Sequence, residues 1–227
     1  TVAGVQTCAL PILTLSIFLF VNAGLTGFFN ANLHDIIYKV IQTPLVGLGS
    51  SIWATLVAIF FVQFLWFFGL HGQILVNSVM DPIWNTLMLD NLEAYQAGKH
   101  LPHIISKSFM ETFTVGLGGS GMTLAVVIIM AFILKKKMYK DVGRLALGAG
   151  LFNVNEPVIF GLPIVLNATI LIPWVLAPIV VTAFNYTVMA VGIVPAPTGV
   201  AVPWTVPVFF SGMLATNSIL GGVLQLV

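Results

Sequence analysis

The amino-acid sequence predicts an all-α, polytopic membrane protein with re-entrant helical hairpins. The mean hydropathy is +1.06, and only 7% of the residues are charged while 59% are hydrophobic. Soluble domains carry roughly 25% charged residues. Apolar runs that suit membrane helices of about 20 residues recur along the chain. Proline and glycine interrupt several of these runs, a pattern typical of helices that stop inside a membrane next to a ligand site.

The first twelve residues are interpreted separately from the rest. Val5 to Ile12 (VQTCALPI) reads like a translated sequencing-library adaptor joined to a gene, so we expect residues 1–12 to be non-native and the gene to begin near Leu13. The segment has no positively charged start, which argues against a signal peptide. Without Cys8 the chain has no thiol for a disulfide, a metal site or a nucleophile. The end of the chain within an apolar stretch indicates a truncated C-terminus.

Three elements are expected before residue 71. Leu13 to Phe29 is long and apolar enough to span a bilayer. His34 to Leu48 carries apolar residues at helical spacing with polar residues between them, which predicts an amphipathic helix in the membrane interface that Pro44 ends or bends. Ser51 to Leu70 is the next strong span, interrupted only by Gln63.

The region from His71 to Ser120 is mixed in polarity and contains no complete apolar span. We therefore expect re-entrant segments there, with a helix–break–helix hairpin between Met80 and Ser120. Gly121 to Leu134 completes another span. A basic cluster follows it and indicates a cytoplasmic loop under the positive-inside rule: Lys135, Lys136, Lys137, Lys140 and Arg144. The net charge of +1 leaves no basic face for nucleic acid.

From Leu145 to Val227 the chain is apolar and carries a single charged side chain, Glu156. Prolines break this stretch repeatedly, at positions 157, 163, 173, 178, 195, 197, 203 and 207. A carboxylate at membrane depth costs roughly 2.5 kcal/mol or more, so it usually faces a cavity. Its neighbours Asn153 and Asn155 indicate a built polar site rather than an interfacial group. We expect a second helical hairpin at residues 153–163, and a continuous helix through Glu156 would contradict this.

Several other motifs are weaker on their own. His71 ends an apolar helix, where a neutral imidazole either donates to and accepts from a sugar hydroxyl or merely caps the helix. Trp204 either stacks on a sugar ring or lies at a membrane interface. Asn77, Asp81 and Asn85 either line the same cavity or face water. The glycine-rich stretch 113–123 lacks the Lys-Ser/Thr ending of a phosphate loop, which favours close packing or a re-entrant turn.

Metal binding and hydrolase chemistry find little support in the sequence. His100 and His103 have a spacing that could hold a metal, but no third ligand accompanies them, so a solvated loop is favoured. No Ser/His/Asp arrangement stands in a shared apolar segment. We expect neither a metal nor a cofactor.

Taken together, these motifs resemble the membrane-embedded enzyme IIC component of the bacterial sugar phosphotransferase system, in its lactose/cellobiose (diacetylchitobiose) family. The similarity rests on blocks from residue 13 to the end, above all those at residues 34–39, 66–72, 80–84 and 153–167. It implies a homodimeric, multi-pass permease of the inner membrane, in contact with lipid. Residues 13–49 would be the last helix of an interface domain plus an amphipathic connector, and residues 50–227 a substrate-binding transport domain.

The resemblance also implies a function. A disaccharide of the cellobiose, diacetylchitobiose or lactose type would be translocated and phosphorylated on its 6-hydroxyl by a phosphocysteine of a separate IIB protein. His71 and Glu156 would hold that hydroxyl, with Glu156 as general base. The implied sugar contacts are His71, Gly72, Asn153, Asn155, Glu156 and Trp204. The tips of His71 and Glu156 should then face one cavity within about 8 Å.

Two other classes of function stay open from the residues alone. One is a proton-coupled secondary sugar transporter in which Glu156 carries the coupling proton and no phosphate is transferred. The other is a structural or channel-like membrane subunit in which Glu156 only organises helix breaks. A requirement for IIB, a proton gradient or no specific sugar at all distinguishes the three.

Overall fold

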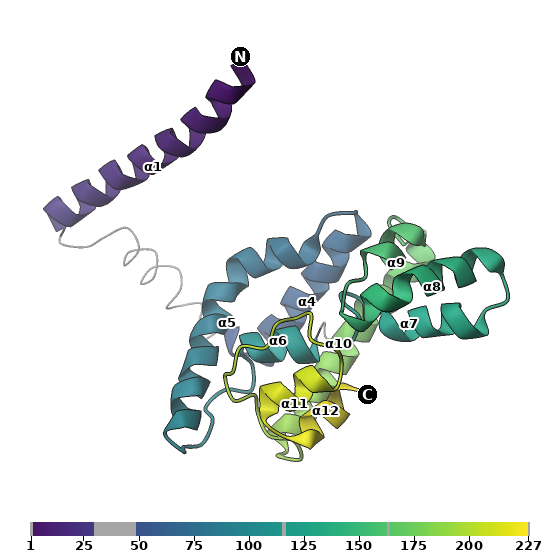
Figure 1. Cartoon of the computed structure of the whole chain (residues 1–227). Coiled ribbons are helices and arrows are strands. Elements are labelled where there is room, and N and C mark those ends of the chain that lie inside the picture. Colours follow the sequence, from purple (N-terminus) through teal and green to yellow (C-terminus); the bar gives the residue numbers. More distant parts are fainter. Residues whose placement is uncertain (1, 30–48, 115–116, 163, 227) are drawn as a thin grey trace. The chain divides into compact units, whose positions relative to one another are not determined.

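The computed structural model describes residues 2–29, 49–114, 117–162 and 164–226, and these contain helices and no strand (Figure 1). The chain falls into two compact units, residues 1–47 and residues 48–227. The first contains α1 (Val2–Phe29), a helix that begins eleven residues before the span expected from Leu13. The predicted amphipathic helix at 34–48 lies outside the described residues.

The second unit begins with two helices that meet at a sharp corner. α4 (Ile52–Phe67) covers most of the predicted span 51–70 and ends before Gly69, whose φ of +78° favours glycine. α5 (Gly72–Gln96) then runs for 25 residues with Pro82 inside it. A Cβ at Gly72 would lie 2.0 Å from the Val62 carbonyl oxygen, so glycine is required where the two helices cross.

The first expected hairpin is present but begins earlier than predicted. Its arms are α5 and the short helix α6 (Lys107–Phe113), joined by the loop 97–106. The sequence gives no hint of a 25-residue helix in this mixed region, because its acidic side chains break the apolar pattern without breaking the helix. A helix forms through its backbone hydrogen bonds, which do not depend on an apolar run of side chains. An apolar run only indicates which helices are buried or face lipid.

A glycine-rich turn follows α6, as expected from the sequence. Gly118, Gly119 and Gly121 all have φ near +80°. A Cβ at Gly121 would lie 2.3 Å from the Trp174 ring, and one at Gly119 would lie 2.6 Å from the Asn153 carbonyl oxygen. Both the tight turn and the close packing therefore require glycine, and neither involves a phosphate loop.

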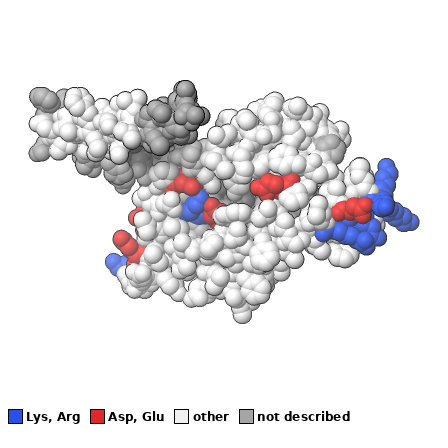
Figure 2. Space-filling view, turned by 45° about the horizontal axis from the view of Figure 1, so that its top comes forward, with Lys and Arg blue, Asp and Glu red and all other residues white. Residues whose placement is uncertain are grey.

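The chain then forms a helical hairpin whose tip carries the basic cluster. α7 (Leu124–Ile128) continues into the π-helix η2 (Ile129–Ile133), and α8 (Lys137–Leu151) returns beside them. Lys135, Lys136 and Lys137 are exposed at the tip. Figure 2 shows this basic group at one edge of a face that otherwise carries few charges.

The second expected hairpin break is confirmed. α8 ends at Leu151, and α9 (Glu156–Gly161) begins at the predicted carboxylate. The break contains Asn153, whose φ of +62° is a conformation that asparagine tolerates better than most residues. Pro157 lies in the first turn of α9, where the missing N–H costs no helical hydrogen bond.

The prediction that every later proline breaks the chain is wrong for two of them. Pro173 and Pro178 both lie inside α10 (Ala168–Ala190), a helix of 23 residues. Membrane helices tolerate proline because neighbouring groups satisfy the freed carbonyls. Among the described residues α10 is the one helix long and apolar enough to cross a membrane, and three shorter apolar helices accompany it, at 15–27, 52–67 and 124–133.

The remaining chain is irregular up to α11 (Phe210–Thr216) and α12 (Ile219–Gln225), so the other late prolines do lie outside helices. The main core joins α4, the hairpin of α7, η2 and α8, and the helices α9 and α10. Its buried members are Val62, Trp66, Val127, Met130, Ala146, Val158, Ile159, Ile164, Trp174 and Val175. This packing fixes the α4–α5 corner against the start of α9, where the site lies.

Candidate functional site

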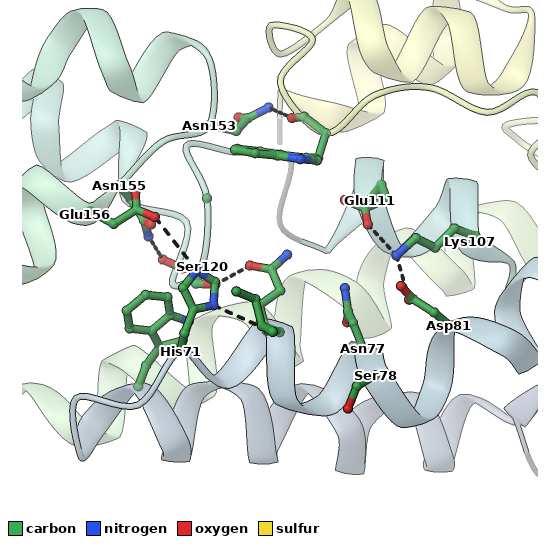
Figure 3. A pocket seen from close by; sticks show the side chains of 15 residues that line it. His71, Asn77, Ser78, Asp81, Lys107, Glu111, Ser120, Asn153, Asn155 and Glu156 are labelled. Carbon is green, nitrogen blue, oxygen red and sulfur yellow. Dashed lines mark hydrogen bonds and ion pairs between the residues drawn. The ribbon is translucent and has the colours of Figure 1, made fainter. Parts of the chain in front are cut away.

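A cavity of about 560 Å³ opens in the second unit, between the α4–α5 corner, α6, the glycine-rich turn and the break before α9 (Figure 3). Its volume lies in the range of small-molecule sites, roughly 300 to 1,000 Å³. Most of the side chains that line it are polar, although the protein is otherwise apolar. It consists of Trp66, His71, Gln73, Ile74, Asn77, Ser78, Asp81, Lys107, Glu111, Gly119, Ser120, Asn153, Asn155, Glu156 and Trp204.

His71 and Glu156 meet at one end of this cavity. His71 Nε2 lies 3.9 Å from Glu156 Oε1, well inside the expected separation, so the prediction that their tips face one cavity is confirmed. The two groups are too far apart for a direct hydrogen bond, yet close enough to hold one hydroxyl between them. Their side chains are 41% and 44% exposed, so a ligand can reach both.

The position of His71 is set by helix capping as well as by the cavity. Its Nδ1 accepts a hydrogen bond from the Ile74 N–H at 3.4 Å at the start of α5. In the neutral ring this acceptor role leaves the proton on Nε2, which faces Glu156. The imidazole also packs on the Trp66 indole, with ring centroids 4.4 Å apart. The helix-capping role and the proposed sugar-binding role of His71 are therefore compatible, because they use different nitrogens of the ring.

The Glu156 carboxylate contacts His71 at 3.9 Å, which is longer than a hydrogen bond. Its Oε2 is buried and has no hydrogen-bond partner among the described residues. A buried carboxylate oxygen without a hydrogen bond destabilises the folded protein, and such a group calls for an explanation such as a binding or catalytic role. The Trp66 Nε1 donor is unpaired in the same sense and lines the same cavity. One buried acceptor and one buried donor at this end are thus without a partner among the described residues.

Asn153 and Asn155 mainly hold backbone segments together. Asn153 donates from Nδ2 to the carbonyls of Trp204 at 2.6 Å and Val206 at 3.0 Å, and its Oδ1 accepts from the Gly118 N–H at 2.9 Å. Asn155 donates to the Ser120 carbonyl. Both residues line the cavity, but their amides are largely engaged in these hydrogen bonds. They therefore fit a role in positioning Glu156 better than the implied role of sugar contacts.

The other two predicted contacts have different outcomes. Trp204 lines the cavity and is 49% exposed, which leaves an aromatic face free. Gly72 is buried and is not among the residues that line the cavity. Its need for a small side chain is explained by the crossing of α4 and α5 described above, so the expected sugar contact from Gly72 is not supported.

A charged cluster at the opposite end of the cavity was missed from the sequence (Figure 3). Lys107 Nζ donates to Asp81 Oδ1 and to Glu111 Oε1, both at 2.6 Å. Burial lowers the pKa of Lys107, but the hydrogen bonds and charges of Asp81 and Glu111 raise it by more, so its net pKa is raised and it stays an ammonium. Asp81 was considered as a cavity residue, and Lys107 was not.

Further polar groups lie between the two ends. Gln73 accepts from the Ser120 hydroxyl at 2.8 Å, and Asn77 lines the cavity on the next turn of α5. Asn77 was one of the open alternatives, now placed in the cavity. Gln73 and Ser120 gave no recognisable signal, because isolated polar residues near a glycine-rich turn are common on wet surfaces.

The two loop histidines lie outside this cavity. His103 Nε2 contacts Asp90 Oδ2 at 3.3 Å, and its backbone N–H donates to the Asn91 side chain. Within the part of the chain that the structure describes, no group of three His, Cys, Asp or Glu residues could hold a metal ion.

Comparison with known proteins shows the family of this chain. The family model described as phosphotransferase system, EIIC, matches residues 4–178. The oligo-beta-mannoside-specific EIIC component of Bacillus subtilis is 62% identical over 95% of this chain and 49% of that protein. The cellobiose-specific EIIC component of Geobacillus stearothermophilus is 43% identical over 86% of this chain and 44% of that protein.

A solved structure is also similar. The crystal structure of the transporter ChbC, the IIC component from the N,N'-diacetylchitobiose-specific phosphotransferase system, matches with a TM-score of 0.82 and 38% identity. The match covers 95% of this chain and 50% of that one. The chain spans about half the length of the curated relatives that it matches.

Proposed function

Because this chain belongs to the phosphotransferase system EIIC family, we propose that it carries the sugar-binding site of a permease for β-linked disaccharides. The cellobiose, diacetylchitobiose and lactose types are the candidates, and short β-mannosides join them because the 62% identical relative is specific for oligo-β-mannosides. The permease moves the sugar across the bacterial cell membrane while a separate IIB protein phosphorylates its 6-hydroxyl.

One observation carries the proposal: His71 Nε2 and Glu156 Oε1 face each other at 3.9 Å in a cavity lined mostly by polar side chains. A 6-hydroxyl between them accepts a hydrogen bond from the Nε2–H of His71 and donates one to Glu156. The carboxylate then takes the hydroxyl proton as the oxygen attacks phosphorus. The P–S bond of the IIB phosphocysteine breaks, and its thiolate leaves.

The rest of the cavity supports binding of a sugar ring. Trp204 offers an exposed aromatic face on which the apolar face of a ring can stack. Asn77 and Gln73 line the cavity and offer polar atoms, and Trp66, whose buried N–H has no partner among the described residues, lines it as well. Asn155 ties the start of α9 to the turn at Ser120, which keeps Glu156 aimed at the cavity.

Family membership makes the protein a membrane component of a phosphotransferase system. A homodimer, several membrane crossings in the cell membrane, and lipid contacts are part of the proposal. The exposed apolar side chains on the described helices support lipid contact, among them Phe60 and Phe61 on α4, Phe132 and Ile133 on η2, and Ile172 and Val180 on α10.

The proposal is tested with the permease at the full length of its relatives, reconstituted into vesicles. Uptake of labelled cellobiose or β-1,4-mannobiose should require phosphorylated IIB and should yield the 6-phosphate inside. Uptake driven by a proton gradient without IIB would instead support the secondary transporter. Failure to bind either sugar would support the structural alternative.

A further inference from the structure

The cavity has two polar ends, and the second has no role in the proposed phosphotransfer. Figure 3 shows the His71–Glu156 end on one side and the charged cluster on the other, with Asn77 and Ser78 between them. A disaccharide whose 6-hydroxyl meets Glu156 therefore places its other unit toward the cluster. We call that unit the distal unit.

The cluster has the wrong charge to attract an anion. Its single ammonium, on Lys107, already donates to Asp81 and Glu111 at 2.6 Å each. Two carboxylates against one ammonium leave the cluster negative. An anionic ligand would have to displace a carboxylate from Lys107 while facing the other one.

The burial of the cluster makes this charge effective. The side chains of Lys107 and Glu111 are only 18% and 13% exposed, and that of Asp81 is 34% exposed. Coulomb interactions at such partly buried sites are several times stronger than in bulk water, and salt screens them less. The ion pairs also fix the three side chains, so they cannot swing away from a ligand.

The space around the cluster shows where a distal group would lie. A second hollow of about 300 Å³ is lined by Asn85, Met88, Lys107, Ser108, Glu111 and residues 201–204. It shares Lys107, Glu111 and Trp204 with the main cavity. This hollow thus gives substituents on the distal unit room to lie against Lys107 and Glu111.

We propose that Asp81, Lys107 and Glu111 form the specificity determinant for the distal unit of the sugar, accepting a neutral or cationic group there and rejecting an anionic one. This rests on the proposed function, because the near ring is oriented by His71 and Glu156. The cluster touches the substrate but takes no part in the phosphotransfer step.

The test uses three ligands that differ only in charge at the distal end. Cellobiitol is neutral, cellobionate carries a carboxylate at the same carbon, and 1-amino-1-deoxycellobiitol carries an ammonium. All keep the glucosyl ring that offers its 6-hydroxyl to Glu156. They are measured in competition with labelled cellobiose on the detergent-purified, full-length permease, beside the matching series from β-1,4-mannobiose.

We expect the anion to bind at least about 10-fold more weakly than the neutral ligand, and the cation to bind as well or better. Equal binding of the neutral and anionic ligands overturns the proposal. Loss of binding by both neutral ligands and their parent disaccharides counts against the proposed function instead, so the two failures are distinguishable.

Variants assign the discrimination to the cluster. Glu111→Gln and Asp81→Asn each keep shape while removing one negative charge, and each should reduce the preference for neutral over anionic ligand to about 3-fold or less. Glu93→Gln removes an exposed carboxylate outside the cavity, from the helix α5 that also carries Asp81, and should keep the full preference. A thermal unfolding scan of each variant accompanies the measurement.

A merely structural role gives a different result. In that case the variants lower the unfolding temperature while the neutral-to-anionic ratio stays at the wild-type value, and this outcome overturns the proposal. If neither variant can be purified, the three-ligand comparison on the wild-type protein still decides it.

Discussion

The two ends of the cavity hold carboxylates in opposite states. At one end Glu156 has a buried oxygen without a partner and a histidine just beyond hydrogen-bond reach. At the other end Asp81 and Glu111 are both bound to one ammonium at 2.6 Å. An unpaired carboxylate is free to accept a proton from a ligand, whereas a paired one contributes fixed shape and charge. The difference separates a group suited to chemistry from groups suited to selection.

Removing the charge of the unpaired carboxylate should have the largest effect. Glu156→Gln keeps the size of the side chain and much of its hydrogen bonding but removes the base. We expect IIB-dependent phosphotransfer to fall about 100-fold or more while sugar binding stays measurable. Phosphorylation and equilibrium binding are measured on the same purified protein. Phosphorylation at the wild-type rate in this variant would mean that Glu156 is not the general base, so the two ends of the cavity would not differ in the way proposed.

Removing the ammonium of the paired end should mainly affect stability. Lys107→Met keeps the aliphatic stem and leaves two carboxylates facing each other in a partly buried site. We expect a loss of about 3 kcal/mol in the free energy of unfolding, at the low end for breaking a buried ion pair because Asp81 is partly exposed. Thermal unfolding in detergent checks this.

A matched control for that variant lies nearby. Lys99→Met removes an exposed ammonium from the loop after α5 and should change stability by less than about 0.5 kcal/mol. Similar losses in both variants would mean that the cluster is no more than a surface ion pair.

Truncating the histidine should weaken sugar binding by a smaller amount. His71→Ala removes the donor to the 6-hydroxyl, the cap on the Ile74 N–H and the contact with Trp66. We expect a loss of about 2 kcal/mol in binding free energy, or roughly 30-fold in affinity. Isothermal titration with the disaccharide measures it, and His100→Ala, an exposed loop variant, should bind like the wild type.

The aromatic wall should give the smallest effect. Trp204→Leu keeps an apolar side chain but removes the stacking face, which we expect to cost about 1 kcal/mol, or roughly 5-fold in affinity. Trp53→Leu changes a tryptophan that is 75% exposed on α4 outside the cavity and serves as the control. An unchanged affinity in Trp204→Leu would place ring recognition on other residues.

The two ends also differ in how well the sequence predicted them. Glu156 stands out because it is the one charge in an apolar stretch, and the adjacent asparagines and proline predicted the helix break that the structure contains. The link to His71, 85 positions earlier, came only from the family resemblance, and the 3.9 Å separation agrees with it. The charged end gave no such signal. Asp81 and Lys107 are 26 positions apart in a region whose mixed polarity resembles a wet loop.

Proline and glycine were informative in unequal ways. Pro157 marks a helix start, but Pro173 and Pro178 lie within α10, because a proline constrains its own φ and not the neighbours that can satisfy the freed carbonyls. The glycines of the turn at 118–121 were correctly expected to allow close packing. The close approach of Gly72 to the Val62 backbone explains the need for glycine where α4 and α5 meet, and only the three-dimensional structure reveals it. The sugar contact expected of Gly72 stays a prediction.

The side chain of Asn153 joins three separate stretches of backbone. They are the helix break that contains Asn153, the glycine-rich turn at Gly118, and the irregular segment before α11, which it reaches through the carbonyls of Trp204 and Val206. None of these stretches has the regular backbone hydrogen bonding of a helix to hold its conformation. Local opening of any one of them must break a bond that also holds another, so their fluctuations are coupled into one cooperative unit. The segment that carries Glu156 and the segment that carries Trp204 therefore open together, and the cavity loses its shape in one step rather than residue by residue.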